Sequence, residues 1–207
     1  MNMMTSTIDR TRPDVGGTKA GWSGAERLGK RLTSWRVLTV SGLFFIAFAA
    51  VFFASSAPFA IPHVEDVCGA APLDVRLYST GGDVNRFLNE CGESGRAAYL
   101  NMQIADLFYP AVFGVFMAAA LGLTLKHLFP LHQAVVGLAV VPLVGSGFDY
   151  LENALAWRAL AAYPDAVASN SLLGLASTAK TVTFWIAGAM LLAGLAALLV
   201  RAIRRLV

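Results

Sequence analysis

Charged residues are scarce in this chain, and their scarcity excludes an ordinary soluble domain. Asp, Glu, Lys and Arg make up 14% of the 207 residues, whereas 57% of the residues are hydrophobic. In a soluble domain roughly a quarter of the residues are charged. The composition therefore predicts a membrane protein.

Sequence motifs for several kinds of chemistry are also missing. The chain has no glycine-rich phosphate loop, no nucleophile elbow and no paired Cys-x-x-Cys, so we expect no cofactor. His63, Glu65 and Asp66 match no strong metal-ligand spacing, and we predict a solvated acidic loop there and no metal site. The excess of Lys and Arg needs no nucleic acid to explain it, because flanking arginines are attracted to anionic lipid head groups.

Four apolar runs are present instead, each long enough to cross about 30 Å of hydrocarbon. They cover residues 36–57, 104–125, 134–157 and 174–200. The expected fold class is an all-α integral membrane protein with four transmembrane helices. The first run could instead be a signal peptide, because small residues follow it in "ASSAPFA", but this run and the polar region before it are longer than is usual in signal peptides.

The distribution of basic residues predicts the orientation. With four spans, 11 of the 16 Lys and Arg residues fall on one side, in residues 1–36, at Lys126 and in residues 201–207. Because basic loops stay inside, both termini are expected in the cytoplasm. We predict that residues 1–35 form a disordered basic tail and that residues 201–207 form a second, short one.

The segment of residues 58–103 is then a loop outside the cytoplasm. It contains the only two cysteines, Cys68 and Cys91, which in an oxidising compartment predict one disulfide; two unpaired buried thiols are the alternative. Asp83 is expected to cap a short helix that ends at Gly92, and Ser94 to cap a second helix that continues into the second span.

Polar side chains interrupt the last three apolar runs with helical spacing. Neighbours three and four positions apart share one helix face. The second run contributes a pair of such residues, and the third and fourth runs contribute three each: Asp106 and Tyr109; Asp149, Glu152 and Asn153; Ser177, Lys180 and Thr181.

The topology puts these three groups at one depth. Asp149 lies about 22 Å along its span from the cytoplasmic end, Lys180 about 9 Å below the outer surface, and Asp106 within about one turn of it. A charged group that faces lipid costs about 2.5–3.5 kcal/mol or more, so the groups are expected to turn inward and meet. Three carboxyls beside one ammonium would require a bound proton, or access of water or a cation.

The sequence leaves several uses for this cluster open. It can be hydrogen-bonded glue between helices, or a pocket that binds a small amphiphile or a partner protein. As an alternative, a membrane-embedded enzyme acting on a lipid-like substrate would use Asp149 or Glu152 as general base and Lys180 to stabilise negative charge. Proton-linked transport ranks last, because the cytoplasmic half of these spans is almost wholly apolar.

Two further patterns concern helix packing. Small residues recur every four positions at Gly114, Ala118 and Gly122, and again at Ala189, Ala193 and Ala197. Such faces allow close packing within the bundle, in a homo-oligomer or with a partner membrane protein. Proline is expected to bend the second span just below Asp106, at Pro110, and the third span nearer its middle, at Pro142.

A set of short motifs resembles a family of uncharacterised four-span bacterial membrane proteins. In that family a G-R-x-x-Y segment leads into a D-x-x-x-P span, and a later span contains D-x-x-E-N. The matching residues are Gly95, Arg96, Tyr99, Asp106, Pro110, Asp149, Glu152 and Asn153. The resemblance excludes the tail and the first span. It implies a location in the inner membrane of a bacterium, with both termini in the cytoplasm, and it implies no activity.

Overall fold

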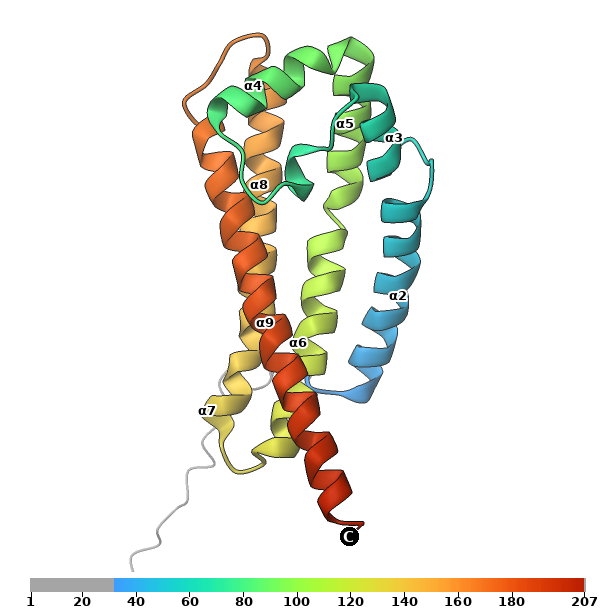
Figure 1. Cartoon of the computed structure of the whole chain (residues 1–207), viewed down its shortest axis with the longest axis vertical. Helices are drawn as coiled ribbons and strands as arrows, with labels where there is room; N and C mark the ends of the chain where they lie inside the picture. The colour runs from blue at the N-terminus through green and yellow to red at the C-terminus, as the bar shows by residue number, and fades with distance from the viewer. Residues whose placement is uncertain (1–31, 207) are drawn as a thin grey trace, which may run out of the picture.

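The computed structural model describes residues 32–206, except for the side chains of residues 133 and 134. Within the described residues 81% are helical, and no strand is present there. The predicted basic tail lies outside the described residues except for residues 32–35. Figure 1 shows long helices side by side, with short helices packed across one end of them.

Three helical segments are long and apolar enough to cross a membrane. They are α2 (Trp35–Ala54), the segment Gly92–Leu128 and α9 (Asn170–Arg204). The predicted third run behaves differently, because it is divided into α7 (Gln133–Val136), the short η2 (Gly137–Val140) and α8 (Val141–Ala162). Although α8 has 22 residues, it is not one of these three segments.

The segment Gly92–Leu128 is interrupted where proline predicts a bend. Helix α5 (Gly92–Asp106) ends just before α6 (Tyr109–Leu128), and Pro110 is the second residue of α6. Proline has no N–H and its ring conflicts with the carbonyl four residues earlier, so the helix cannot continue unchanged. Side chains of α8 bind carbonyls near the break: Tyr150 donates to the oxygen of Leu107 at 2.9 Å and Ser146 to that of Pro110 at 2.6 Å.

The predicted third run is likewise interrupted beside its proline. The 3-10 segment η2 ends at Val140, and Pro142 is the second residue of α8. A proline in the first turn of a helix needs no N–H partner there, which favours a helix start at this position. Helix α8 consequently begins later and ends later than the predicted run of residues 134–157.

The long helices pack through small residues. Helix α8 lies against α9, and α6 contacts α2, α8 and α9. A Cβ added at Gly114 would collide with Ser146 of α8, and one at Gly194 would be 2.6 Å from the methyl carbon of Thr124. On α9, however, the predicted small-residue face is exposed at Ala189, Ala193 and Ala197. A contact of that face with a second copy or a partner helix stays a prediction.

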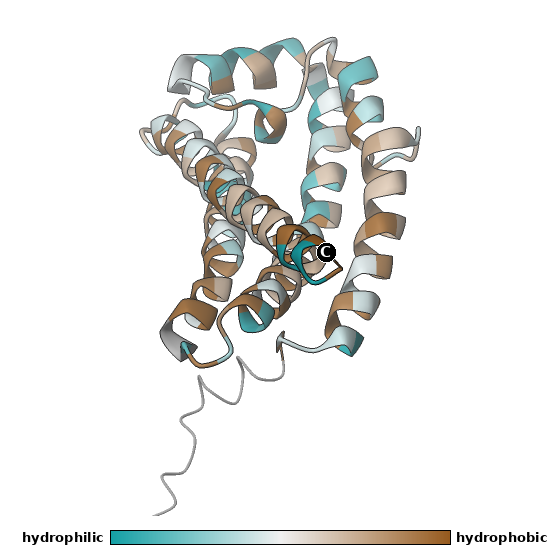
Figure 2. Cartoon of the chain, turned by 60° about the horizontal axis from the view of Figure 1, so that its bottom comes forward, coloured by the Kyte–Doolittle hydropathy of each residue, from teal (hydrophilic) through white to brown (hydrophobic). Residues whose placement is uncertain are grey.

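The short helices form what we call the cap, residues 58–91. It contains α3 (Ile61–Cys68), the short 3-10 helix η1 (Leu73–Val75) and α4 (Gly81–Glu90). Its apolar core joins these elements to α5 and to the end of α8, with buried side chains at Val64, Leu73, Leu88, Tyr99 and Ala159. In Figure 2 hydrophilic residues gather in α4 and α5, whereas α2 is mostly hydrophobic.

The predicted disulfide between Cys68 and Cys91 is present. It joins the end of α3 to the junction between α4 and α5. Gly95 lies directly against it, because an added Cβ there would be 2.9 Å from the Cys68 sulfur. The disulfide therefore fastens α3 to the start of α5.

Both predicted helix caps in this region are wrong. Thr80, not Asp83, caps α4: its hydroxyl accepts the N–H of Asp83, while the Asp83 carboxylate accepts the N–H of Thr80 at 2.9 Å. This reciprocal pair starts the helix earlier than the acidic residue alone indicates. Hydrogen bonds from Thr80 lower the pKa of the Asp83 carboxyl. Helix α5 likewise begins at Gly92, before Ser94.

Candidate functional site

The polar groups expected to meet do meet, where the break between α5 and α6 faces α8 and α9. Asp106 is the last residue of α5, the acidic pair and Asn153 are on α8, and Lys180 is on α9. The side chain of Asp149 is 2% exposed, that of Glu152 fully buried and that of Lys180 13% exposed. These groups are thus shielded from both solvent and lipid.

Lys180 is the electrostatic centre of the site. Its ammonium lies 3.2 Å from Oδ1 of Asp149 and 3.1 Å from the backbone oxygen of Asp74, and it forms an ion pair with Oε2 of Glu152. A lysine ammonium has three N–H donors. Two of them are used by Asp149 and Asp74, and the charge is further compensated by the ion pair with Glu152.

The remaining contacts connect the helices. Ser177 of α9 donates to Oε1 of Glu152, so both oxygens of that carboxylate are engaged. Asn153 of α8 donates to Oδ2 of Asp106 at 2.9 Å. Helices α5, α8 and α9 are thereby joined through buried polar bonds, and such bonds fix the rotation of each helix against its neighbours.

Two members of the site were not expected from the sequence. Asp74, in the 3-10 turn of the cap, binds Lys180 through its backbone oxygen and accepts a hydrogen bond from Gln103 of α5 at 2.7 Å through its carboxylate. A signal for Gln103 exists, since it lies three positions before Asp106 and shares its helix face. Asp74 has no such signal, because a loop residue has no helical periodicity.

The cap reaches the site because its segment of residues 74–80 packs closely on α9. Thr178 donates to the backbone oxygen of Leu77 at 2.9 Å. Gly174 leaves no room for a side chain, since an added Cβ would be 2.8 Å from the backbone nitrogen of Ser79 and would also collide with its carbonyl oxygen. Only glycine permits this approach of backbone to helix.

This close approach gives a first prediction. Gly174→Ala should destabilise the protein by about 1–3 kcal/mol, because the segment around Ser79 must move away from α9. Gly147→Ala on α8 is the matched control: an added Cβ there meets nothing within 4 Å, so the better helix propensity of alanine should leave stability equal or slightly higher. Thermal unfolding in detergent measures both variants. Equal midpoints for the two would contradict the packing described above.

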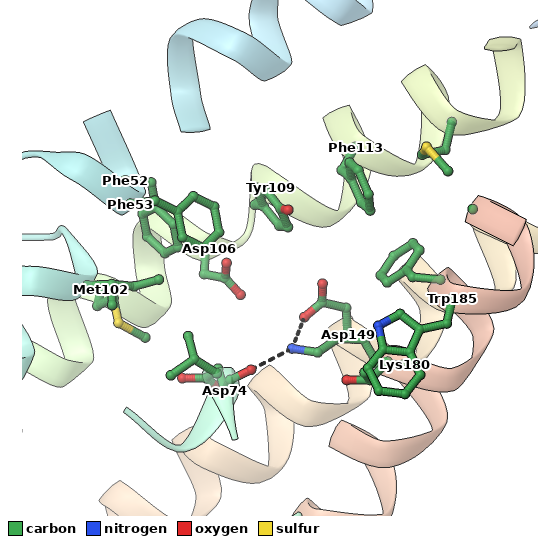
Figure 3. A pocket seen from close by; sticks show the side chains of 16 residues that line it. Phe52, Phe53, Asp74, Met102, Asp106, Tyr109, Phe113, Asp149, Lys180 and Trp185 are labelled. Atoms are coloured by element: carbon green, nitrogen blue, oxygen red, sulfur yellow. Dashed lines mark hydrogen bonds and ion pairs between the residues drawn. The ribbon is translucent and has the colours of Figure 1, made fainter. Parts of the chain in front are cut away.

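A cavity of about 440 Å³ opens beside these groups. Figure 3 shows Asp106, Asp149, Lys180 and Asp74 gathered at one side of it, with Tyr109, Phe113 and Trp185 along the rest. Phe52 and Phe53 of α2 and Phe184 of α9 complete its aromatic wall. The cavity thus joins a large aromatic surface to a small group of buried charges.

The predicted site residues divide into two groups. One group lines the cavity: Asp106, Tyr109, Asp149, Lys180 and Thr181. The other group, Glu152, Asn153 and Ser177, is buried outside the lining. Glu152 pairs with Lys180, Asn153 donates a hydrogen bond to Asp106, and Ser177 donates one to Glu152. Among the described residues no group of three or more His, Cys, Asp and Glu side chains is arranged to hold a metal ion.

The cavity reaches the surface between α2 and α9. Phe53 is 44% exposed and Trp185 is 65% exposed, although both line it. The rest of the lining comes from the cap, from α5 and α6, and from Asp149 of α8. Phe53 and Trp185 therefore form the rim.

Comparisons of the chain with protein-family models, with curated proteins and with solved structures find no match. The resemblance to a four-span bacterial family therefore stays a prediction.

Proposed function

We propose that this protein is a four-span protein of a bacterial inner membrane that binds a small amphiphile in the cavity between α2, α6, α8 and α9. In this topology α8 is the remaining span, the cap lies outside and both termini are cytoplasmic. The excess of basic residues at the predicted cytoplasmic ends supports this orientation. Helix α8 packs along α9, as a span in a bundle would.

One observation carries the proposal: a cavity with aromatic walls ends at buried carboxyls. Ligand sites of this kind are mostly apolar, with a few polar groups that fix the orientation of the ligand. An apolar chain would lie along Phe113, Phe184 and Trp185, and a polar head would reach Asp106 and Asp149.

The rim supports entry from the lipid. In the proposed topology the opening between α2 and α9 faces the outer leaflet, so a molecule dissolved there would enter sideways past Phe53 and Trp185. A purely water-soluble ligand would have no use for this opening.

The arrangement of Lys180 favours binding over the alternative of an enzyme. To stabilise negative charge on a substrate, its ammonium would have to leave Asp149, Glu152 or the oxygen of Asp74. Removing a partner from a buried charge is costly. The roles of Asp149 or Glu152 as general base are therefore the weaker hypothesis.

Filling the cavity tests the proposal. Gly188 of α9 lines the cavity, and a Cβ added to it meets nothing within 4 Å, so Gly188→Leu should fold normally and occupy the space. In maltoside detergent, a neutral bromoalkyl alcohol should quench the fluorescence of Trp185 in a saturable way in the unchanged protein. In Gly188→Leu we expect affinity for this probe to fall at least about tenfold.

Two further variants complete this experiment. Gly147→Leu adds the same side chain on α8 at another glycine with free space and outside the cavity lining, so the probe should bind to it as to the unchanged protein. Trp185→Phe identifies the fluorescence change that comes from the rim. The proposal fails if quenching does not saturate, or if Gly188→Leu and Gly147→Leu bind the probe equally.

A further inference from the structure

The charges around the cavity do not balance. Asp106, Asp149 and Glu152 face the single ammonium of Lys180, and the carboxylate of Asp74 lies on the same cavity. Its partner Gln103 is neutral. With ionised carboxyls the region has a clear excess of negative charge, and a buried negative charge without a positive partner is unfavourable.

Two carboxylate oxygens at the cavity also lack a hydrogen-bond donor. Oδ2 of Asp106 accepts from Asn153 and Oδ1 of Asp149 from Lys180, but the second oxygen of each carboxylate receives no hydrogen bond from any residue in the described part of the chain. Asp106 is 5% exposed and Asp149 1% exposed, so bulk water does not compensate for this. Both side chains line the cavity.

The ammonium of the site, in contrast, is already paired. Lys180 donates to Asp149 and to the backbone oxygen of Asp74, and it forms an ion pair with Glu152. An anionic head group would therefore meet acceptors without finding a free ammonium. A positive head group would meet two carboxylate oxygens that have no other partner.

The aromatic wall suits a cation as well. A positive group near the face of Tyr, Phe or Trp is attracted by the ring, and quaternary ammonium groups are bound by such rings. Tyr109 lies beside Asp106 and Asp149 in Figure 3, with Phe113 next to it. The two rings are stacked with centroids 5.4 Å apart.

We propose that the head group bound in this cavity is a cation, a primary or quaternary ammonium, held by the free oxygens of Asp106 and Asp149. This inference rests on the proposed function and adds the charge of the ligand to it. The ammonium can belong to a membrane lipid or to a separate single-chain amphiphile.

Competition against the bromoalkyl alcohol tests the charge of the head group. Three probes with the same alkyl chain are compared on the full chain in maltoside: decyltrimethylammonium, decanol and decyl sulfate. We expect the ammonium to compete at least about tenfold better than decanol, and the sulfate to compete less well than decanol. Competition by added phosphatidylethanolamine would assign the head to a lipid; its absence would assign it to a free amphiphile.

Charge-removing variants complete the test. In Asp106→Asn the advantage of the ammonium over decanol should fall below about threefold, while decanol itself binds unchanged. Asp149→Asn is the second variant if the first does not fold. Asp165→Asn, an exposed aspartate outside the cavity, should keep the full advantage.

The outcomes separate the two proposals. If the bromoalkyl alcohol binds but all three probes compete equally, or Asp106→Asn and Asp149→Asn retain the ammonium preference, the inference on charge is wrong and the binding function stands. If the bromoalkyl alcohol itself does not bind, the proposed function is wrong.

Discussion

Replacing Lys180 with methionine will destabilise this protein by about 3–5 kcal/mol, the usual consequence of removing one partner from a buried ion pair. The loss leaves Asp149 and Glu152 without their positive partner, and both residues are buried. The bond to the backbone of Asp74 is lost as well, so the cap loosens from α9. Thermal unfolding in detergent, together with the yield of folded protein, measures the effect.

Two comparisons make this prediction specific. Lys126→Met removes an exposed lysine near the end of α6 and should change stability little. Combining Lys180→Met with Asp149→Asn and Glu152→Gln removes the opposing charges together, and most of the lost stability should return. Were the single Lys180→Met variant as stable as Lys126→Met, the ion pair would not hold the helices together.

Removing the disulfide should cost about 3 kcal/mol, since the bridge closes a loop of roughly two dozen residues in the unfolded chain. The double variant Cys68→Ala, Cys91→Ala frees the end of α3 from the start of α5, the contact against which Gly95 packs. We expect a lower unfolding temperature and faster proteolysis within residues 58–91. Reductant should lower the stability of the unchanged protein and have no effect on the double variant.

The effect of the disulfide should extend to the site. Asp74 lies within the loop that the bridge closes, and it contacts both Lys180 and Gln103. Loosening the cap should therefore weaken binding of the bromoalkyl alcohol, even at temperatures where the long helices remain folded. Binding that is unchanged after reduction would show that the long helices alone hold the site.

Much of the architecture could be predicted from the sequence. Hydropathy predicts the membrane character, because the length of an apolar helix is fixed by the thickness of the bilayer. The depth argument correctly brings Asp106, Asp149 and Lys180 together, because the rise per residue of a helix gives the height of each side chain. The helix starts were predicted less accurately, because local hydrogen bonds of Thr80 and the geometry of Pro142 set where α4 and α8 begin.

By itself the sequence determined which residues share a helix face, and it predicted the disulfide between Cys68 and Cys91 that the structure contains. Only the tertiary structure decided which carboxyls line the cavity and which are buried outside its lining, because this depends on how each helix is rotated against its neighbours. It also decided that Asp74 of the cap completes the site. A loop segment has no periodicity from which its position can be calculated, and its place follows from the close contact that Gly174 allows.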